Sequence, residues 1–378
     1  MSHGRAFAIV TGGGTGGHVQ PALAVAEALV ERGHARSSLR FVGCHHGMEG
    51  RLVPEAGFDI TLLPGRGIQR RLTAENIGAA AGLTAACAMA VAEVRRRRPR
   101  VVITVGGYAG FPSSLAALAE RVPVVVVSYD TVPGAANRFV GRFAAANAVA
   151  YPGTPLPRAE VTGPPVRAAV LAVSRSAGGR AQARGTLGLD KDRFLVLVTG
   201  GSQGARSINT ATVEWCRSWR ARTEVAVYHV AGERNLAHVR RDALAAGLLG
   251  SATGLDYRLV GYESSMPVLL AAADLVVARA GASTVAELTA VGVPSVLVPL
   301  PGAPSDHQTR NAAALAAAGA CVTVADEDCT GERLGTVVEM LIQDKPRRLE
   351  MEAAARRLGH RDAAGRVAEL AESVAGRA

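Results

Sequence analysis

Aromatic residues are scarce in this sequence, at 4% of 378 residues. Proteins that hold single-stranded nucleic acid stack its bases on such rings, and here the basic residues are also dispersed, so nucleic acid is the partner that the sequence favours least. Long apolar runs are missing too: none reaches the roughly 18 residues that a membrane-spanning helix needs. The most Ala-rich stretch, 77–94, is interrupted by Gly, Thr, Cys and Glu93, which is typical of a soluble helix. We therefore expect no transmembrane segment.

Cysteine and lysine are also rare. The five cysteines are odd in number and lack the spacing of metal ligands, so we expect reduced, mostly buried thiols. The N-terminus runs into a strand-like segment at 6–11 without the features of a signal peptide, which predicts a cytoplasmic protein. The formal net charge is +10, and only Lys191 and Lys345 are Lys; the other cations are Arg. This charge favours anionic lipid or phosphorylated ligands.

Standard nucleotide-binding fingerprints are absent. GGGTGGH (12–18) has no Lys-Ser or Lys-Thr pair after its glycines, which disfavours a kinase-type phosphate loop. No acidic residue clearly ends the expected strand at 39–43, so the dinucleotide pattern of dehydrogenases fits poorly. Two acidic triplets, 190–192 and 326–328, match a metal-holding Asp-x-Asp pattern, but both lie in expected turns or loops. Nothing in the sequence requires a metal or another cofactor.

Short Val- and Ile-rich runs alternate with helical stretches along most of the chain. Such runs suit parallel strands covered on both faces. AIVTGGGTGGH (8–18) and LVLVTGGSQGA (195–205) each place VTGG at the end of a strand and open a helix soon after. We therefore predict an α/β fold of two Rossmann-like parallel-sheet domains facing each other across a cleft. The expected parts are an N-terminal domain (1–166), a C-terminal domain (167–345) and C-terminal helices that pack back on the N-terminal domain (346–378).

Three glycine-rich loops follow expected strands, at 12–18, 106–112 and 200–205. Glycine lets backbone N–H groups approach an anion closely, and helix N-termini add unsatisfied donors. One such loop could be glycine-rich for steric reasons alone, but three loops in both halves favour ligands with phosphate groups. His18 closes the first loop, and a neutral imidazole there could take a proton from an attacking hydroxyl group. The alternative is a histidine that only braces the turn.

The segment 279–312 is the densest in small and polar residues. A small-residue turn leads into an expected helix, and Glu287, one turn later, could accept hydrogen bonds from both hydroxyl groups of a ribose. A carboxylate near a helix start is also favoured by the helix dipole alone. Further on, Asp306, His307 and Gln308 suit recognition of sugar hydroxyls, unless Asp306 simply caps the next helix.

A segment at 65–83 mixes apolar and basic residues. An apolar patch with a basic rim could rest on anionic lipid, with each nearby Arg contributing about 1 kcal/mol. A buried helix face with exposed charges explains the pattern equally well. The candidate membrane patch comprises Ile68, Arg70, Arg71, Leu72 and Ile77.

Seven motifs follow one another in a fixed order: GGGTGGH (12–18), GGYAGFP (106–112), VPGAANR (132–138), GPPVR (163–167), GGSQGA (200–205), RAGASTVAEL (279–288) and DHQTRNA (306–312). This order, from Phe7 to about residue 320, resembles the MurG family, the N-acetylglucosaminyltransferases that make lipid II from lipid I in peptidoglycan synthesis. The resemblance implies a GT-B fold without metal, a role in cell-wall formation and cell division, and peripheral attachment to the cytoplasmic face of the cell membrane. It implies two substrates, a UDP-GlcNAc donor in the C-terminal half and a polyprenyl-diphosphate-linked muramoyl-peptide acceptor in the N-terminal half.

Site residues are also implied by the resemblance, position by position. His18 matches the region of the reacting centre and is the expected catalytic base. The implied acceptor-diphosphate cradle comprises Gly14, Thr15, Gly106, Gly107 and Tyr108. The implied donor contacts are Ser202 on the diphosphate, Arg167 on the nucleotide side, Tyr262 and Glu263 near the uracil, Ala282, Ser283 and Thr284 near the sugar and phosphates, Glu287 on the ribose, His307 and Gln308 on the sugar, and Thr15, Gly16, Gly17 and Asp130 from the N-terminal half.

Two positions depart from the family pattern. VSYD (127–130) stands where His-Glu-(Gln or Ala)-Asn is common, so Asp130 replaces an Asn near the donor sugar and can accept but not donate hydrogen bonds. Pro164 also stands where Asn is usual. The expected reaction is an inverting transfer of GlcNAc to the MurNAc 4-hydroxyl of lipid I. The alternatives are a related transferase with another glycolipid or secondary-metabolite acceptor, a non-catalytic UDP-sugar-binding protein, and a UDP-GlcNAc 2-epimerase, which would share the fold.

Overall fold

The structure is a computed structural model that describes residues 5–14, 16–65, 75–250, 254–303 and 306–377. Its internal contacts divide the chain into two compact units. Unit 1 comprises Met1–Ala168 and His360–Ala378, and unit 2 comprises Ala169–Gly359. The last helix, α15 (Ala363–Gly376), therefore belongs to unit 1, whereas the preceding helix, α14 (Lys345–Leu358), belongs to unit 2. The sequence predicts both helices, with the rest of 346–378, on the N-terminal domain.

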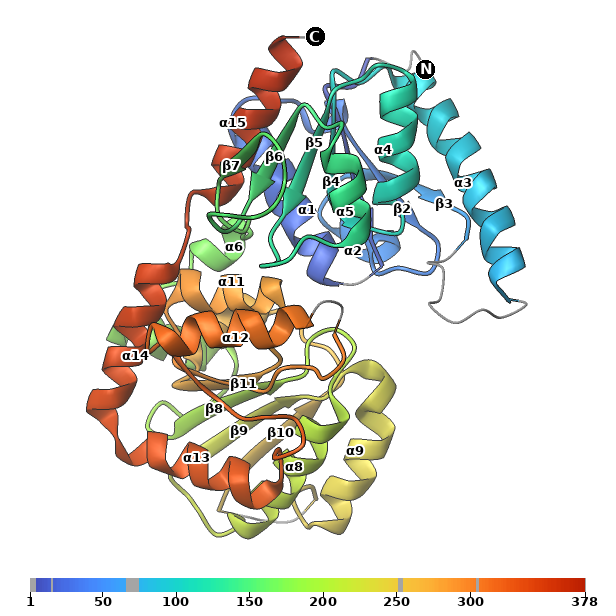
Figure 1. The fold of residues 1–378 in the computed structure, drawn as a ribbon. Coiled ribbons are helices and arrows are strands. Elements are labelled where there is room, and N and C mark those ends of the chain that lie inside the picture. Colours follow the sequence, from blue (N-terminus) through green and yellow to red (C-terminus); the bar gives the residue numbers. More distant parts are fainter. Residues whose placement is uncertain (1–4, 15, 66–74, 251–253, 304–305, 378) are drawn as a thin grey trace. The chain divides into compact units, whose positions relative to one another are not determined.

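Unit 1 is built on a parallel sheet (Figure 1). Within the described residues, its seven strands run in the order β3-β2-β1-β4-β5-β6-β7. The strand order reverses direction between β1 and β4, which is the topological switch point at which such sheets bind ligands. The strands are β1 (Ala8–Gly13), β2 (Leu39–Cys44), β3 (Asp59–Leu63), β4 (Val101–Gly107), β5 (Val124–Ser128), β6 (Ala146–Val149) and β7 (Ala159–Val161).

Helices cover the sheet of unit 1 in two layers. Helix α4 packs against α3 and α5, whereas α1 packs against α2 and α15. Glu372 of α15 accepts hydrogen bonds from Arg32 at 2.6 Å and from His34 at 2.9 Å, so polar contacts reinforce the packing of α15 beside α1. The helices are α1 (Gly16–Glu31), the 3₁₀ helix η1 (Arg36–Ser38), α2 (Glu49–Glu55), α3 (Glu75–Arg97), α4 (Gly110–Ala119) and α5 (Ala135–Gly141).

Unit 2 repeats the same design. Its described residues form six parallel strands in the order β10-β9-β8-β11-β12-β13, with the switch point between β8 and β11. The strands are β8 (Phe194–Thr199), β9 (Val225–Val230), β10 (Asp256–Val260), β11 (Leu275–Ala278), β12 (Ser295–Leu297) and β13 (Cys321–Thr323). The helices are α6 (Ala168–Leu171), which begins at the boundary between the units, α7 (Ala177–Thr186), α8 (Arg206–Ser218), α9 (Glu233–Ala245), α10 (Met266–Ala272), α11 (Ala282–Val291), α12 (His307–Ala317), α13 (Gly331–Gln343) and α14.

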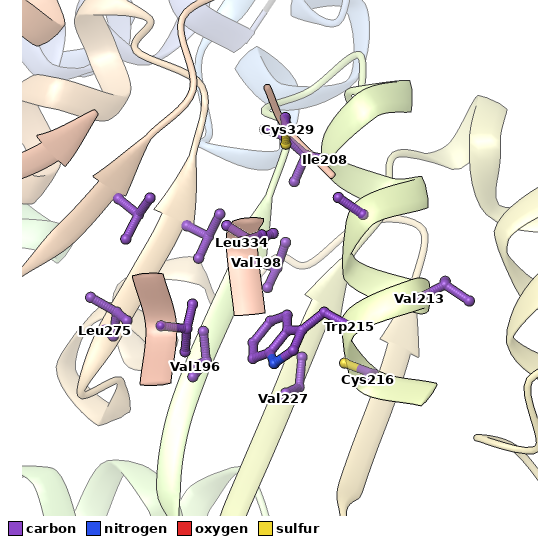
Figure 2. Packing of buried hydrophobic residues seen from close by; sticks show 14 of the residues in the cluster. Val196, Val198, Ile208, Val213, Trp215, Cys216, Val227, Leu275, Cys329 and Leu334 are labelled. Atoms are coloured by element: carbon purple, nitrogen blue, oxygen red, sulfur yellow. The ribbon is translucent and has the colours of Figure 1, made fainter. Parts of the chain in front are cut away.

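The largest buried side chain of unit 2 is Trp215 of α8. Figure 2 shows its indole among Val196, Val198 and Val227 of the sheet. A Cβ atom on Gly335 of α13 would lie 2.9 Å from the Trp215 ring, so glycine lets α13 approach α8 closely at this point. Because a buried aromatic side chain contributes several kcal/mol, α8 and α13 are fixed against the sheet together.

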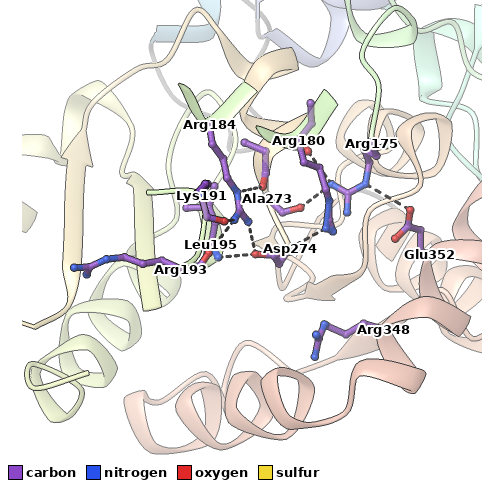
Figure 3. Close-up of polar contacts among 12 residues, drawn as sticks. Arg175, Arg180, Arg184, Lys191, Arg193, Leu195, Ala273, Asp274, Arg348 and Glu352 are labelled. Atoms are coloured by element: carbon purple, nitrogen blue, oxygen red, sulfur yellow. Dashed lines mark hydrogen bonds and ion pairs between the residues drawn. The ribbon is translucent and has the colours of Figure 1, made fainter. Parts of the chain in front are cut away.

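Arginines hold the first part of unit 2 on its sheet (Figure 3). Arg180 and Arg184 of α7 both pair with Asp274, at 3.0 and 2.5 Å. Arg175 is buried and donates to carbonyl oxygens at the end of α10, including that of Ala273 at 2.6 Å. Burial lowers the pKa of Arg175 to about 10, so its guanidinium is still charged at neutral pH. These contacts satisfy the carbonyl groups that a helix end leaves unpaired.

The predicted fold class is confirmed, because each unit carries a parallel sheet between helical layers. All five cysteines are free and four of them are buried, as their sequence context indicated. No helix among the described residues is both long and apolar enough to cross a membrane.

Candidate functional site

In unit 1, the neighbouring strands β1 and β4 both end in glycine. Gly13 pairs with Gly107 after a register shift between Thr11 and Gly13. Gly106 and Gly107 have φ angles of 92° and 79°, a conformation that other residues rarely adopt. A Cβ atom on Gly107 would lie 2.2 Å from the carbonyl oxygen of Gly13. The two turns can therefore pack backbone against backbone only because this position is glycine.

His18 lies in the first turn of α1, directly after the first glycine-rich turn. Its ring is edge-on to the ring of Tyr129, with centroids 6.2 Å apart. The Tyr129 hydroxyl donates to the carbonyl oxygen of Gly17 at 2.9 Å and so holds the backbone beside His18. A Cβ atom on Gly106 would stand 3.5 Å from His18 Cδ2 and 3.4 Å from Asn137 Oδ1. His18, Gly106 and Asn137 thus surround one small space at the carboxyl edge of the sheet.

Asp130 places a negative charge near two tyrosines. Burial raises the pKa of Tyr129 well above its ordinary value, and the charge of Asp130 adds to the effect. The same two causes raise the pKa of Tyr151 to about 12. Both phenols therefore stay protonated at physiological pH and act as hydrogen-bond donors or acceptors rather than as charges.

Two predicted binding residues make contacts inside unit 1. Arg167, predicted on the nucleotide side, pairs with Glu27 of α1 at 2.6 Å and with Gln20 at 3.4 Å. Tyr108, predicted in the acceptor cradle, donates its hydroxyl to the carbonyl oxygen of Pro64 at 3.1 Å. Both side chains are thereby held in place on the unit that carries His18, and their binding roles stay predictions.

In unit 2, the turn 200–205 connects β8 to α8. A Cβ atom on Gly200 would lie 2.2 Å from the amide nitrogen of Ala205, and one on Gly204 would lie 2.2 Å from the carbonyl oxygen of Ala231. Both positions therefore require glycine, while Ser202 between them is exposed. Among the described residues no side chain caps the start of α8, so its first N–H groups are oriented for an anion.

The start of α11 lies beside this turn. Strands β8 and β11 are parallel neighbours, with Thr199 opposite Ala278, so the segments that follow them leave the sheet side by side. Helix α11 begins after Gly281, again without a side-chain cap among the described residues. Four predicted donor contacts lie in its first two turns, of which the first is buried and the others are half-buried: Ala282, Ser283, Thr284 and Glu287. Two uncapped helix starts therefore meet at the switch point of this sheet.

The predicted sugar-recognition motif is tied to the same place. Helix α12 begins at His307, and the Gln308 side chain accepts a hydrogen bond from the amide of Leu300 at 3.0 Å. Asn311 is buried and donates to the carbonyl oxygen of Ala280 at 3.1 Å. Because Ala280 immediately precedes the start of α11, this bond fixes the 306–312 motif against the 279–284 segment.

The predicted uracil-side residues follow β10, at one edge of the sheet. Glu263 accepts hydrogen bonds from the hydroxyl of Tyr228 at 2.6 Å and from the amide of Ser265 at 2.7 Å. Burial, followed by the interaction with Glu263, raises the pKa of Tyr228 to about 12. Tyr262 is half-buried beside it. The Glu263 side chain thus holds the loop after β10, and contact of its main chain with a ligand stays a prediction.

A polar ring that includes Arg279, the first residue of the RAGASTVAEL motif, braces the start of α8 after the 200–205 turn. The Arg279 guanidinium donates to Asp326 at 2.5 Å and to the Ser207 hydroxyl at 3.0 Å, and Ser207 also donates to Asp326 at 2.5 Å. The ring joins the ends of β11 and β13 to the start of α8. A groove of about 710 Å³ runs along it, lined in part by 203–207, Leu300 and Thr330.

One aspartate of each acidic triplet forms an ion pair with an arginine. Asp326 pairs with Arg279, and Asp190 lies 3.7 Å from Arg193. In the part of the chain that the structure describes, no group of three or more His, Cys, Asp or Glu side chains is arranged to hold a metal ion. That the reaction needs no metal stays a prediction.

Some predicted residues fall outside the described part of the chain. These are Thr15 and the membrane-patch residues Ile68, Arg70, Arg71 and Leu72; Ile77 lies in α3, but its side chain is not described.

The exposed aromatic group formed by Phe139 of α5 and Phe143, which follows that helix, was not predicted from the sequence. Phe139 and Phe143 are 44% and 60% exposed, their rings are 5.7 Å apart, and Phe139 also contacts Phe111 at 5.9 Å. The neighbouring Arg138 and Arg142 are exposed too. The sequence signal that could have predicted an interaction surface here is the run of two aromatic residues, each next to an arginine, in a chain with few aromatic residues.

Three further residues near the first turn were missed: Asn137, Tyr129 and Glu49. Asn137 lies in VPGAANR and Tyr129 in VSYD, and neither motif pattern assigns these residues a role. Glu49 is a carboxylate that is 1% exposed in a glycine-rich stretch. Its residue type gave no sign of burial, because acidic residues are almost never fully buried unless paired.

Comparisons with known proteins cover nearly the whole chain. Residues 8–149 match the glycosyltransferase family 28 N-terminal domain, and residues 195–367 match the glycosyltransferase family 28 C-terminal domain. A protein of Nocardioides sp. is 41% identical over 362 residues, which cover 96% of each chain. A protein of Desulforudis audaxviator is 36% identical over 374 residues, which cover 98% of each chain. Both are named UDP-N-acetylglucosamine–N-acetylmuramyl-(pentapeptide) pyrophosphoryl-undecaprenol N-acetylglucosamine transferase.

Solved structures agree with this similarity. The crystal structure of MurG from Acinetobacter baumannii has a TM-score of 0.72 and 26% identity, covering 97% of this chain and 99% of that chain. A UDP-GlcNAc 2-epimerase from Neisseria meningitidis, bound to UDP-GlcNAc, has a TM-score of 0.64 at 14% identity, covering 98% of this chain and all of that chain (100%). The second likeness concerns the fold alone.

Proposed function

Because the chain belongs to glycosyltransferase family 28, we propose that it transfers N-acetylglucosamine from UDP-GlcNAc to the muramoyl sugar of lipid I and so forms lipid II. Lipid I is a muramoyl-pentapeptide linked to undecaprenyl diphosphate. The observation that carries the proposal is the pair of glycine-rich turns, one at the switch point of each sheet. Each turn is followed by a helix start, and each substrate of this reaction contains a diphosphate. One anion-binding turn therefore serves the donor and the other serves the acceptor.

The donor belongs to unit 2 in this proposal. Amides of the 200–205 turn, with Ser202, and the start of α11 (Ala282, Ser283 and Thr284) receive the UDP diphosphate. Glu287 accepts hydrogen bonds from the ribose, His307 and Gln308 recognise the sugar, and Tyr262 and the Glu263 main chain face the uracil. Arg167 completes the nucleotide side.

The acceptor belongs to unit 1. Gly14, Thr15, Gly106, Gly107 and Tyr108 form the cradle for its diphosphate, and Gly16, Gly17 and Asp130 approach the donor sugar. As a carboxylate, Asp130 accepts hydrogen bonds from sugar hydroxyls and cannot donate to the N-acetyl oxygen. The contact with the donor sugar at this position thus differs in polarity from one made by asparagine.

The reaction proceeds by direct displacement. The MurNAc 4-hydroxyl oxygen forms a bond to C1 of GlcNAc on the face opposite the UDP, and the hydroxyl proton passes to the neutral imidazole of His18. The bond from C1 to the phosphate oxygen breaks, and its electron pair leaves with UDP. The sugar is inverted from α to β. Helix-start amides of unit 2 stabilise the negative charge that develops on the leaving diphosphate.

We also propose that the protein works as a peripheral protein on the cytoplasmic face of the membrane, where its lipid-linked acceptor resides. The segment 65–83 supplies one apolar and basic patch in the sequence. The exposed pair Phe139 and Phe143 with Arg138 and Arg142 supports a second contact, because interfacial aromatics and cations suit anionic lipid. Asn137 lies beside the His18 space and shares helix α5 with Phe139, so this helix links the proposed reacting centre to one of the exposed rings.

The test is an assay of UDP release with UDP-GlcNAc and a lipid I analogue, combined with identification of the product. Formation of the β-1,4-linked disaccharide on the carrier is the expected result. UDP release with another glycolipid but not with lipid I would show that the acceptor is not lipid I. Binding of UDP-GlcNAc without any turnover would show that the protein binds the UDP-sugar but is not a transferase.

A further inference from the structure

Glu49 is a buried carboxylate beneath the first glycine-rich turn. It is the first residue of α2, and it is 1% exposed. Its Oε2 accepts a hydrogen bond from the amide of Gly14 at 2.9 Å. Its Oε1 accepts from the amide of Cys44 at 2.8 Å and from the Cys44 thiol at 3.0 Å. One side chain therefore connects the ends of β1 and β2.

The surroundings of Glu49 are shaped for this carboxylate. Cβ atoms built on Gly13, Gly43 and Gly47 would each lie within 2.3 Å of a Glu49 side-chain atom, at 2.1, 2.3 and 1.9 Å. Three glycines thus leave the space that the side chain fills. In the described part of the chain no cationic side chain pairs with Glu49, and the donors described at its carboxylate are the amides of Gly14 and Cys44 and the Cys44 thiol. Burial of a carboxylate that is stabilised by hydrogen bonds rather than by a cation costs free energy. This cost indicates that the Glu49 side chain has a specific role.

The bond from Gly14 has a direct effect on the turn. Gly14 has a φ angle of 103°, and a Cβ atom there would have no heavy atom within 4 Å, so steric contacts do not fix this residue. Instead, the hydrogen bond from the Gly14 N–H to the Glu49 carboxylate fixes the orientation of Gly14. The thiol of Cys44 stays a donor, because burial, followed by the hydrogen bond to Glu49, raises its pKa to about 12.

We propose that Glu49 is a positioning residue of the acceptor turn: it does not touch substrate, but it orders Gly14 so that the neighbouring amides face the acceptor diphosphate. This inference rests on the proposed acceptor role of the 12–17 turn. The turn is then ordered before the acceptor binds, so binding does not have to supply the cost of ordering it.

Glu49→Gln tests the inference. The amide has the same shape, but its NH2 group must face either the Gly14 amide or the Cys44 donors, so one hydrogen bond becomes a contact between donors. We expect KM for the lipid I analogue to rise by about tenfold, as loss of a charge-assisted hydrogen bond implies. KM for UDP-GlcNAc should not change. Hydrogen exchange should become faster in the 12–18 segment alone. A global loss of stability would instead make exchange faster throughout unit 1.

Glu93→Gln is the matched control. Glu93 is another buried carboxylate of unit 1, on α3, where it accepts hydrogen bonds from Arg96 and Arg97. It should lower the melting temperature without changing either KM. Gly14→Ala acts on the turn directly and should raise the acceptor KM. Should Glu49→Gln fail to fold, Glu49→Asp, which keeps the charge but cannot span both donors, gives the same test.

The outcomes separate the two proposals. An unchanged acceptor KM in the Glu49 variant, together with a raised KM in Gly14→Ala, overturns the role of Glu49 and leaves the turn as the acceptor site. Unchanged acceptor KM values in both variants overturn the acceptor role of the turn and, with it, the inference about Glu49.

Discussion

The hydroxyl of Tyr129 donates a hydrogen bond to the carbonyl oxygen of Gly17, 2.9 Å away. Gly17 immediately precedes His18, and the Tyr129 ring lies edge-on to the imidazole. Tyr129 stands in the segment VSYD, where the family commonly has Gln or Ala. In this chain a buried phenol therefore fixes the backbone that carries the proposed base.

The variant Tyr129→Phe should distinguish the contribution of the hydrogen bond to Gly17 from that of the ring contact with His18. Phenylalanine keeps the edge-on contact but loses the hydrogen bond, which should cost about 1 kcal/mol of stability. We expect kcat to fall by about tenfold, since small shifts of a reacting group are costly, while KM for UDP-GlcNAc stays the same. Tyr151→Phe, at the other phenol near Asp130, is the control and should retain kcat. Equal kcat in both variants would show that Tyr129 does not position His18.

His18→Ala should lower turnover by about 100- to 10,000-fold, the usual contribution of a general base. UDP affinity, measured by calorimetry, should stay at the wild-type value because His18 is not among the proposed UDP contacts. Wild-type turnover in this variant would remove His18 from the role of base.

Glu287→Ala should act on the donor instead. Loss of the carboxylate removes hydrogen bonds to the ribose, and KM for UDP-GlcNAc should rise by about tenfold or more. Steady-state kinetics with each substrate varied in turn measures the effect, and KM for the acceptor should not change. An unaltered donor KM would contradict the ribose assignment.

Gly107→Ala should destabilise unit 1. The new Cβ atom would meet the Gly13 carbonyl oxygen at 2.2 Å, and φ at this position is 79°. Strain of this kind costs about 1–3 kcal/mol before the steric clash is added. Gly33→Ala, with a φ of 99° and no heavy atom within 4 Å of the new Cβ, is a control for the φ strain alone. Urea unfolding followed by circular dichroism should show the larger loss for Gly107→Ala.

His229 predicts how the stability of unit 2 depends on pH. It is fully buried between the Tyr257 hydroxyl at 2.8 Å and Asn209 Oδ1 at 2.9 Å. Asn209 donates its amide group to the carbonyl oxygen of Ala231, so its oxygen faces His229, whose Nε2 donates while Nδ1 accepts from Tyr257. This arrangement fits only the neutral ring, and burial lowers its pKa from 6.5 to about 3.

Between about pH 3 and pH 6.5, His229 is therefore protonated in the unfolded state but not in the folded state. Because the unfolded state binds one more proton than the folded state, the stability contributed by His229 is complete above pH 6.5. It falls by about 1.4 kcal/mol per pH unit as the pH drops toward 3. Both tryptophans, Trp215 and Trp219, lie in unit 2, so their fluorescence follows its unfolding. His229→Gln should show a weaker pH dependence in this window; the same slope as in the wild type would contradict the assignment.

Much of the fold followed from local patterns. Val-rich runs such as 101–107 specify buried parallel strands, because only a sheet covered on both faces needs continuous apolar residues. The glycine turns and the motif order identified the family, and the comparisons confirm both the family and the transferase function. The residues that would carry out the reaction stay predictions.

By itself, the sequence determined the two parallel sheets, the turns at their switch points and the family, because strand pattern and turn chemistry are properties of neighbouring residues. Only the tertiary structure decided which distant side chains support those turns. Glu49 reaches Gly14, Tyr129 reaches Gly17, and Arg279 reaches Asp326 through contacts between residues 35, 112 and 47 positions apart. Such contacts depend on how strands are ordered in a sheet, and a single sequence carries no local signal for a carboxylate or a phenol that packing will bury.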